Sequence, residues 1–173
     1  LACSNHFVAF LLGVEILGVS LYAMIAYTVH DTASAKFPLE AGIKYLILSA
    51  LASAITLFGI ALVYAFLGSM GFDEIPAALE AAGEPGPFFI IGVLMIVAGA
   101  AFKLSLVPFH IWTSDVYEGA PVPVTAYLAT VSKAAMLAVT LRLLLASNAL
   151  EFNAVTAVLT VMAAASMILG NLL

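Results

Sequence analysis

The stretch from Lys103 to Lys133 decides the fold, and it reads KLSLVPFHIWTSDVYEGAPVPVTAYLATVSK. A lysine stands at each end within otherwise apolar sequence, and His110 and three prolines lie between them. Proline in a helix interior removes a backbone donor and clashes with the preceding turn. We therefore expect an apolar helix that breaks near residues 105–108 and continues as a short second half-helix over 109–118.

The composition around this stretch is that of a membrane protein. The chain has 173 residues, of which 65% are hydrophobic and 9% charged, and its mean hydropathy is +1.20. Soluble domains carry about 25% charged residues. Only helices and closed barrels satisfy every backbone group in lipid, and barrel strands would alternate apolar with polar residues. The apolar segments here do not alternate, so an all-α, polytopic transmembrane helix bundle is predicted.

Five membrane-spanning segments are expected, because a transmembrane helix needs about 20 mostly apolar residues. The third of them is interrupted at Pro108, and residues 1–173 form a single transmembrane domain. The expected segments are Phe7–Val29, Tyr45–Gly68, Gly86–Leu106, about Gly119 to Leu145, and Phe152–Leu173.

The connectors between these segments differ in charge. Connector 30–44 holds Lys36 and Lys44, whereas connector 69–85 holds four acidic residues and no basic one. Lysine and arginine accumulate in cytoplasmic loops, which places 30–44 on the cytoplasmic or matrix side. The run IPAALEAA at 75–82 is expected to form a short surface helix.

The cysteine count and the net charge exclude several kinds of site. The single cysteine, Cys3, excludes an internal disulfide and a cysteine-based metal site. The net charge of −5 gives no basic patch for nucleic acid. The chain lacks an initiator methionine and a signal-peptide pattern, and it begins and ends in apolar sequence. We interpret it as an internal fragment of a longer polytopic protein.

Three ionisable residues fall near the middle of three separate predicted spans, namely Glu15, Lys103 and Lys133. Each such charge costs about 2.5–3.5 kcal/mol at a helix centre. Mutual pairing, water or function must offset that cost. One interpretation is a structural ion pair between Glu15 and one lysine, which leaves the other lysine over. Because desolvation disfavours the charged form of a buried lysine, the alternative interpretation is a proton relay.

His110 lies seven residues after Lys103, on the same helical face if the helix were unbroken. Histidine titrates near neutral pH and could pass a proton between lysines, or it could be an interfacial side chain bound to backbone. Asp115 and Glu118 are expected in a wetted loop. Trp112 and Tyr117 are interpreted as anchors at the membrane interface.

Small residues near these charges have two possible roles. Ser105, Thr130 and Ser132 could hold ordered water beside the lysines, or they could let helices pack closely. Close packing is the favoured interpretation for Gly13, Gly18 and Gly59. A helix broken inside the membrane needs protein or water to cover its backbone, and ion-coupled transporters place their sites at such breaks.

The run over 103–125 and the run ATVSKAA at 129–135 resemble the antiporter-like subunit N of respiratory complex I, which is subunit 2 in mitochondria. EAGIKYLILSA at 40–50 and LLGVEIL at 11–17 are similar to it as well. DVYEGAP favours this subunit over related antiporter subunits. The family usually has proline where Ser114 stands, which affects the expected geometry of that loop.

The resemblance implies that the chain covers the fifth to the ninth helix of a longer subunit built from two inverted repeats. It also implies roles for four residues in proton translocation. Glu15 would be the fifth-helix glutamate, Lys103 the lysine at the broken seventh helix, Lys133 the eighth-helix lysine, and His110 the histidine after the break. A second half-channel would lie outside these residues.

The expected function is that of a membrane subunit of a proton-translocating NADH–quinone oxidoreductase. No cofactor or metal is expected in this chain, and quinone, flavin and iron–sulfur centres would belong to partner subunits. The expected partners are other complex I membrane subunits, lipid and protons, in a bacterial inner, mitochondrial inner or thylakoid membrane. A subunit of a cation/proton antiporter and a purely structural membrane subunit are the alternatives.

Overall fold

The computed structural model describes residues 1–27 and 36–172, and within these ranges the chain folds into helices joined by short connections. Five helices are long and apolar enough to cross a membrane, as predicted. The elements in order are α1 Phe7–Ala26, α2 Lys36–Leu67, α3 Ile75–Ala82, α4 Pro87–Leu104, α5 Ile111–Gly119, α6 Val122–Tyr127, the π-helix η2 Leu128–Ser132, α7 Lys133–Ala146, the 3₁₀-helix η3 Ala149–Glu151, and α8 Asn153–Leu172.

The predicted boundaries agree with these helices except at the start of α2. The predicted connector 30–44 is wrong over its second half, because α2 already begins at Lys36. Pro38 falls in the first turn of α2, where the missing N–H has no partner to lose. The predicted end of the first segment at Val29 lies outside the described residues. The short helix over 75–82 is confirmed as α3.

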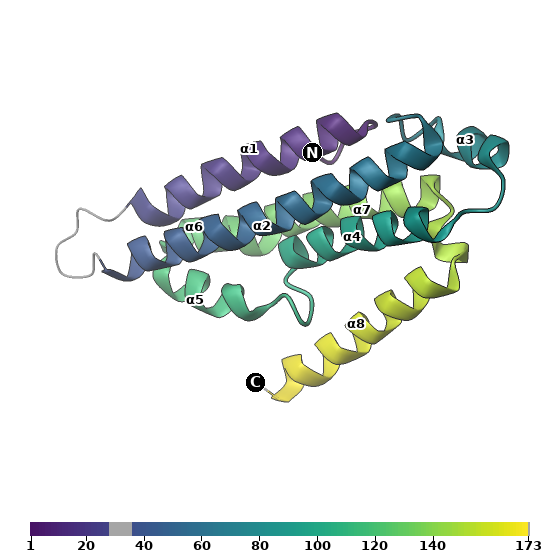
Figure 1. Ribbon diagram of the computed structural model, residues 1–173. Helices are drawn as coiled ribbons and strands as arrows, with labels where there is room; N and C mark the ends of the chain where they lie inside the picture. Colours follow the sequence, from purple (N-terminus) through teal and green to yellow (C-terminus); the bar gives the residue numbers. More distant parts are fainter. Residues whose placement is uncertain (28–35, 173) are drawn as a thin grey trace.

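The long helices α1, α2, α4 and α7 run side by side in an elongated bundle (Figure 1). Two facing glycines, Gly59 and Gly92, let the backbones of α2 and α4 approach closely. A Cβ added to Gly59 would lie 2.7 Å from the carbonyl oxygen of Gly92, and one added to Gly92 would lie 2.9 Å from that of Gly59. Small residues of this kind let membrane helices pack backbone against backbone. The close-packing interpretation of Gly59 is confirmed.

Two apolar clusters fill the interior of the bundle. The larger one joins α1, α2, α4 and α7 near the α3 end, and it includes Phe7, Phe10 and Phe89. The second cluster joins α1, α2 and α5 near the opposite end, around Tyr45 and Trp112. Lys103 lies next to this second cluster and contacts Tyr45.

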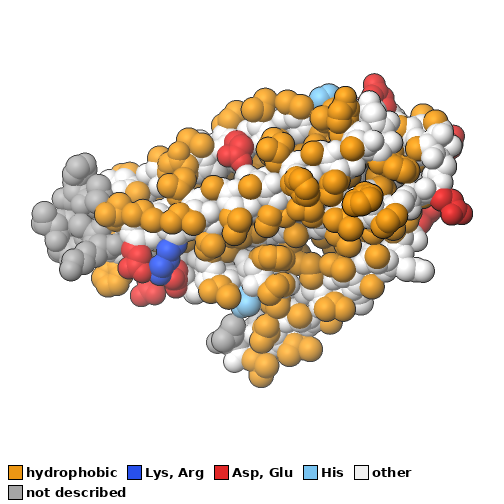
Figure 2. Space-filling view, viewed as in Figure 1, with side chains coloured by type: hydrophobic (Ala, Val, Ile, Leu, Met, Phe, Trp, Pro, Cys, Tyr) orange, Lys and Arg blue, Asp and Glu red, His pale blue; other side chains and the backbone are white. Residues whose placement is uncertain are grey.

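The helix α8 leaves the bundle at an angle (Figure 1) and buries only Val155 and Met162. Hydrophobic side chains cover most of the visible face in Figure 2, and charged side chains gather towards the two ends of the molecule. One acidic patch lies over α1, whose only acidic residue is Glu15. An apolar girdle of this kind is the surface that a bilayer requires.

Candidate functional site

The predicted break is confirmed between α4 and α5. α4 ends at Leu104, and Ser105 adopts the left-handed conformation with φ 59°. The backbone groups released by the break find side-chain partners. The N–H of Val107 donates to Ser166 Oγ of α8 at 3.0 Å, and Trp112 Nε1 donates to the carbonyl of Phe102 at 3.1 Å. Protein thus covers the broken segment, as membrane burial requires.

Lys103 lies in the last turn of α4 and is buried, with 5% of its surface exposed. Its Nζ donates to Ser49 Oγ at 2.7 Å and to Tyr45 OH at 3.2 Å, both on α2. The same nitrogen lies 5.1 Å from the centre of the Tyr45 ring. The C-terminal end of a helix also carries partial negative charge. Two hydroxyls, an aromatic ring and a helix end therefore stabilise this ammonium.

Glu15 lies on α1, across from Lys103, and is half-buried. Within the described part of the chain it forms no ion pair within 4.0 Å, so Lys103 is held by hydroxyls rather than by a carboxylate. Glu15 is nevertheless close enough to interact electrostatically with Lys103. The structure therefore brings the two residues into one neighbourhood without joining them.

Gly18 makes this arrangement possible. It lies one helical turn after Glu15, on the same side of α1. A Cβ at Gly18 would lie 3.4 Å from Ser49 Oγ and 3.5 Å from Lys103 Nζ. Gly18 does allow close packing. It packs against the ammonium of Lys103 and the hydroxyl of Ser49.

Lys133 follows the π-helix η2 directly and is half-buried. The π-turn was not predicted, since nothing in LATVS distinguishes it from ordinary helix, although short π-turns inside helices often occur at functional sites. Lys133 Nζ lies 5.7 Å from the centre of the Tyr117 ring. It makes no ion pair or hydrogen bond to any residue that the structure describes.

His110 stands at the N-terminal end of α5 and is half-buried, and its Nδ1 is buried without a hydrogen-bond partner among residues 1–27 and 36–172. Three hydroxyls share this condition, those of Ser105, Thr113 and Tyr117. His110, Thr113 and Tyr117 follow one another at helical spacing, so one face of α5 is polar and buried. Buried polar atoms without partners are rare in proteins and mark water or functional sites.

Two predictions on α5 are wrong. Trp112 is not an interfacial anchor, since it is 4% exposed and its ring nitrogen donates to the carbonyl of Phe102 at the break. Tyr117 also points its hydroxyl into the protein rather than to the interface. The sequence pattern places both aromatics near a charged turn, but it cannot tell that the broken helix folds them inward against α2.

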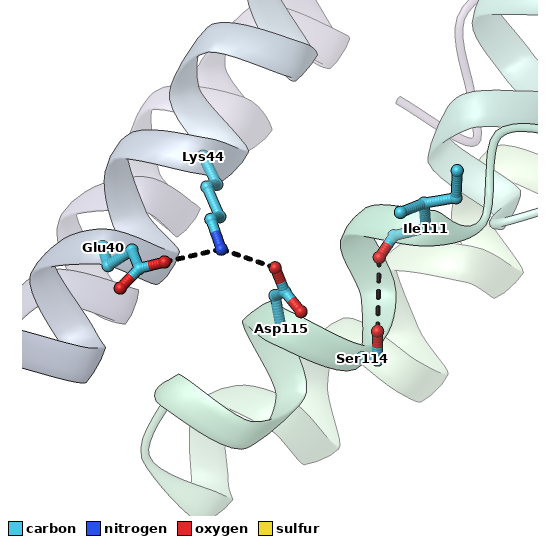
Figure 3. Close-up of polar contacts among 5 residues, drawn as sticks. All are labelled: Glu40, Lys44, Ile111, Ser114 and Asp115. Atoms are coloured by element: carbon cyan, nitrogen blue, oxygen red, sulfur yellow. Dashed lines mark hydrogen bonds and ion pairs between the residues drawn. The ribbon is translucent and has the colours of Figure 1, made fainter.

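Asp115 was expected in a wetted loop, and it lies instead on α5 in an ion pair. Lys44 Nζ lies 2.6 Å from Asp115 Oδ2 and 2.6 Å from Glu40 Oε1, one turn earlier on α2 (Figure 3). Glu118 borders a cavity of about 170 Å³ beside them. All three paired side chains are partly exposed, and such pairs contribute about 0–1 kcal/mol. They join α5 to α2 at the edge of the bundle.

Ser114, which stands where the resembling family usually has proline, does not disturb this region. It lies within α5, and its hydroxyl donates to the carbonyl of Ile111 at 3.3 Å (Figure 3). The helix therefore continues through the position at which the loop geometry was in question.

Sequence reasoning missed the two α2 residues that hold Lys103. Tyr45 and Ser49 are four residues apart and so share one face of α2. The available signal was the four-residue spacing of two hydroxyls at the start of an uncharged segment, but Ser53 and Thr56 in the same segment make that signal weak. Their partner is 54 to 58 residues away along the chain, and that distance hid the contact.

The family described as NADH:quinone oxidoreductase/Mrp antiporter, transmembrane, matches residues 4–173. NADH-quinone oxidoreductase subunit N of Nitrosospira multiformis is 51% identical, and that of Methylococcus capsulatus is 50% identical. Each alignment covers 100% of this chain and 34% of the relative. The chain thus spans about a third of the length of these curated relatives.

Solved structures resemble the chain in the same way. A chain of respiratory complex I from Thermus thermophilus with bound aureothin gives a TM-score of 0.69 at 37% identity, covering 82% of this chain and 30% of that one. A chain of the membrane-bound sulfane sulfur reductase, an archaeal respiratory membrane complex, gives a TM-score of 0.66 at 25% identity, covering 77% and 27%.

Proposed function

Because this chain belongs to the NADH:quinone oxidoreductase/Mrp antiporter transmembrane family, we propose that it forms part of a proton-translocating membrane subunit of an NADH–quinone oxidoreductase. Relatives about half identical over the whole chain carry the name subunit N of that enzyme. The helical fold and the five candidate spans agree with a multi-pass integral membrane protein.

One observation supports the proton-carrying role above the others, and it is the buried environment of Lys103. A leucine at this position would avoid the cost of a charge in the membrane. The chain instead keeps a buried amine beside a helix break and surrounds it with groups that suit both its protonation states. Ser49 Oγ accepts a hydrogen bond from the ammonium, and a hydroxyl can equally donate to a neutral amine.

The mechanism that we propose is electrostatic. Lys103 has two alternative neighbours, the hydroxyls of α2 and the carboxylate of Glu15 on α1. An opposite charge nearby favours the ammonium, whereas desolvation away from it favours the neutral amine. A rearrangement elsewhere in the complex that changes the distance between Glu15 and Lys103 would load and release a proton. Lys133 and His110 would continue the path.

The test is Lys103→Ala and Lys133→Ala in the complete complex. We expect proton pumping and coupled quinone reduction to fall on the order of tenfold or more, since a positioned proton-transfer group contributes at least that much. Arg142→Ala is the matched control, because Arg142 is exposed near the end of α7. Pumping is measured in reconstituted vesicles, and assembly by co-purification. Normal pumping in both lysine variants would refute the proposal.

A second candidate function is suggested by the family description, which also includes Mrp antiporters. The subunit would then exchange a cation for protons without electron transfer. The subunits that co-purify with the full-length protein distinguish the two: flavin and iron–sulfur subunits support the oxidoreductase, and small antiporter subunits alone support the antiporter. The other alternative is a purely structural subunit, in which the charges only hold helices together. In that case a variant with Glu15 and Lys103 exchanged would retain full function.

The remaining roles follow from the proposed assignment. Redox centres and the quinone would be bound by partner subunits, and this chain would contribute only titratable side chains. Its partners would be other membrane subunits of the complex.

A further inference from the structure

Lys103, which is buried, and Lys133, which is half-buried, each lie against a tyrosine. Lys103 Nζ donates to the hydroxyl of Tyr45 at 3.2 Å and lies 5.1 Å from the centre of its ring. Lys133 Nζ lies 5.7 Å from the centre of the Tyr117 ring. The lysines come from α4 and α7, and the tyrosines from α2 and α5. Four helices thus contribute one side chain each to a lysine–tyrosine–tyrosine–lysine order.

The two tyrosines belong to one packed group. Tyr45 belongs to the apolar cluster that includes Trp112, with the two rings 5.2 Å apart, and Tyr117 packs against that cluster. Tyr117 comes from α5, which packs against α2, the helix that carries Tyr45. Two tyrosines, one against each lysine, therefore lie in the packed region between α2 and α5.

The hydroxyl of Tyr117 is buried and has no hydrogen-bond partner among the described residues. A buried hydroxyl without a hydrogen-bond partner is energetically unfavourable. Because this oxygen is buried, a partner has to come from within the bundle. The flexible ammonium of Lys133, 5.7 Å from the centre of the ring, is a charged group placed to supply one.

We propose that Tyr45 and Tyr117 form a two-phenol relay that carries a proton between Lys103 and Lys133, an inference that rests on the proposed function. The ammonium of Lys103 gives its proton to the oxygen of Tyr45, and Tyr45 gives its own hydroxyl proton to the oxygen of Tyr117. Tyr117 gives its hydroxyl proton to the neutral amine of Lys133. One N–H bond breaks at Lys103, one forms at Lys133, and both phenols end neutral.

Phenols suit this position for a chemical reason. A tyrosine hydroxyl is both donor and acceptor and is neutral at physiological pH. It therefore transmits a proton without holding a charge in the low-dielectric interior, where a third unpaired charge would be costly. The step from Tyr45 to Tyr117 requires their hydroxyls to meet, which the rearrangement that moves Lys103 would bring about.

The test uses Tyr45→Phe, Tyr117→Phe and the double variant in the complete complex. Phenylalanine keeps the ring, its packing and its attraction for the ammonium, and it removes only the hydroxyl. Each single variant is expected to lower the proton-pumping rate and kcat for quinone reduction on the order of tenfold, with KM for quinone unchanged. Tyr64→Phe is the matched control, since Tyr64 is exposed on the same helix as Tyr45.

The double variant separates a relay from two independent structural effects. Two steps in series make the double variant about as defective as either single variant, whereas independent effects multiply. Multiplied defects, or normal pumping in Tyr117→Phe, would overturn the relay. If the lysine variants are defective while Tyr117→Phe pumps normally, the relay fails and the proposed function stands. Should Tyr45→Phe fail to assemble, the rate of Tyr117→Phe alone decides.

Discussion

Among single residues, the absence of a side chain at Gly18 matters as much as the charge at Lys103. The ammonium occupies space that α1 would otherwise fill, and Ser49 holds it there. Glycine weakens a helix by about 1 kcal/mol relative to alanine, so its presence in α1 has a local cost that close packing offsets. Lys103 and Lys133 stood out in the sequence as charges within apolar segments. The importance of Gly18 was not evident, because it depends on which helix lies opposite.

A larger side chain at Gly18 should displace Lys103. Gly18→Val adds two methyl groups beyond a Cβ that already lies 3.5 Å from Lys103 Nζ. We expect a severalfold loss of proton pumping in an assembled complex, on the order of the 1–3 kcal/mol cost of overpacking. Gly18→Ala is the control and should pump nearly normally, since its Cβ makes ordinary contacts. Equal pumping by Gly18→Val and the unaltered complex would contradict this prediction.

At the scale of helices, the central element is the break between α4 and α5. Its position was predictable, because Pro108 cannot donate a backbone hydrogen bond and interrupts an apolar run. Its stabilisation was not predictable. Ser166 reaches Val107 from 59 residues away, and Trp112 folds back onto Phe102. Local sequence determines where a helix ends, whereas the partners of its released groups come from whichever helices pack there.

Ser166→Ala should loosen the break specifically. The variant removes the hydrogen bond to the N–H of Val107 and leaves that group without its partner, at a cost of about 1 kcal/mol or more. Hydrogen–deuterium exchange at residues 105–110 should accelerate about fivefold or more. Thr160→Ala is the matched control, because the Thr160 hydroxyl is exposed and donates only within α8. Unchanged exchange at 105–110 would show that the contact stabilises nothing.

For the whole molecule, the class of fold and all five spans followed from hydropathy and length, since lipid permits few alternatives. The candidate site followed only in part. Glu15, Lys103 and Lys133 were conspicuous as charges inside apolar segments, but Tyr45, Ser49 and Tyr117 resemble ordinary membrane residues. Which side chains meet depends on how α2, α4 and α5 pack, and that packing is set by glycines.

The α2–α4 contact should be required for assembly. Gly59→Ala places a Cβ 2.7 Å from the carbonyl oxygen of Gly92, and backbone at that distance must move. We expect reduced yield of assembled complex and a lower midpoint of thermal inactivation, by a few degrees for each kcal/mol lost. Gly86→Ala, which meets no atom within 4 Å, should assemble normally. Normal yield and stability for Gly59→Ala would mean that the helices tolerate wider separation.

The π-turn η2 has a consequence for how the fourth span can vary. Its wider loop accommodates an extra residue between the stretch that begins at Val122 and the stretch that begins at Lys133. Deleting one residue inside 128–132 would return the span to ordinary winding and leave Lys133 facing Tyr117. The same deletion elsewhere between Val122 and Lys133 would swing the lysine by about 100° around the helix axis. Shortening is therefore tolerated at one place in this span, directly before Lys133.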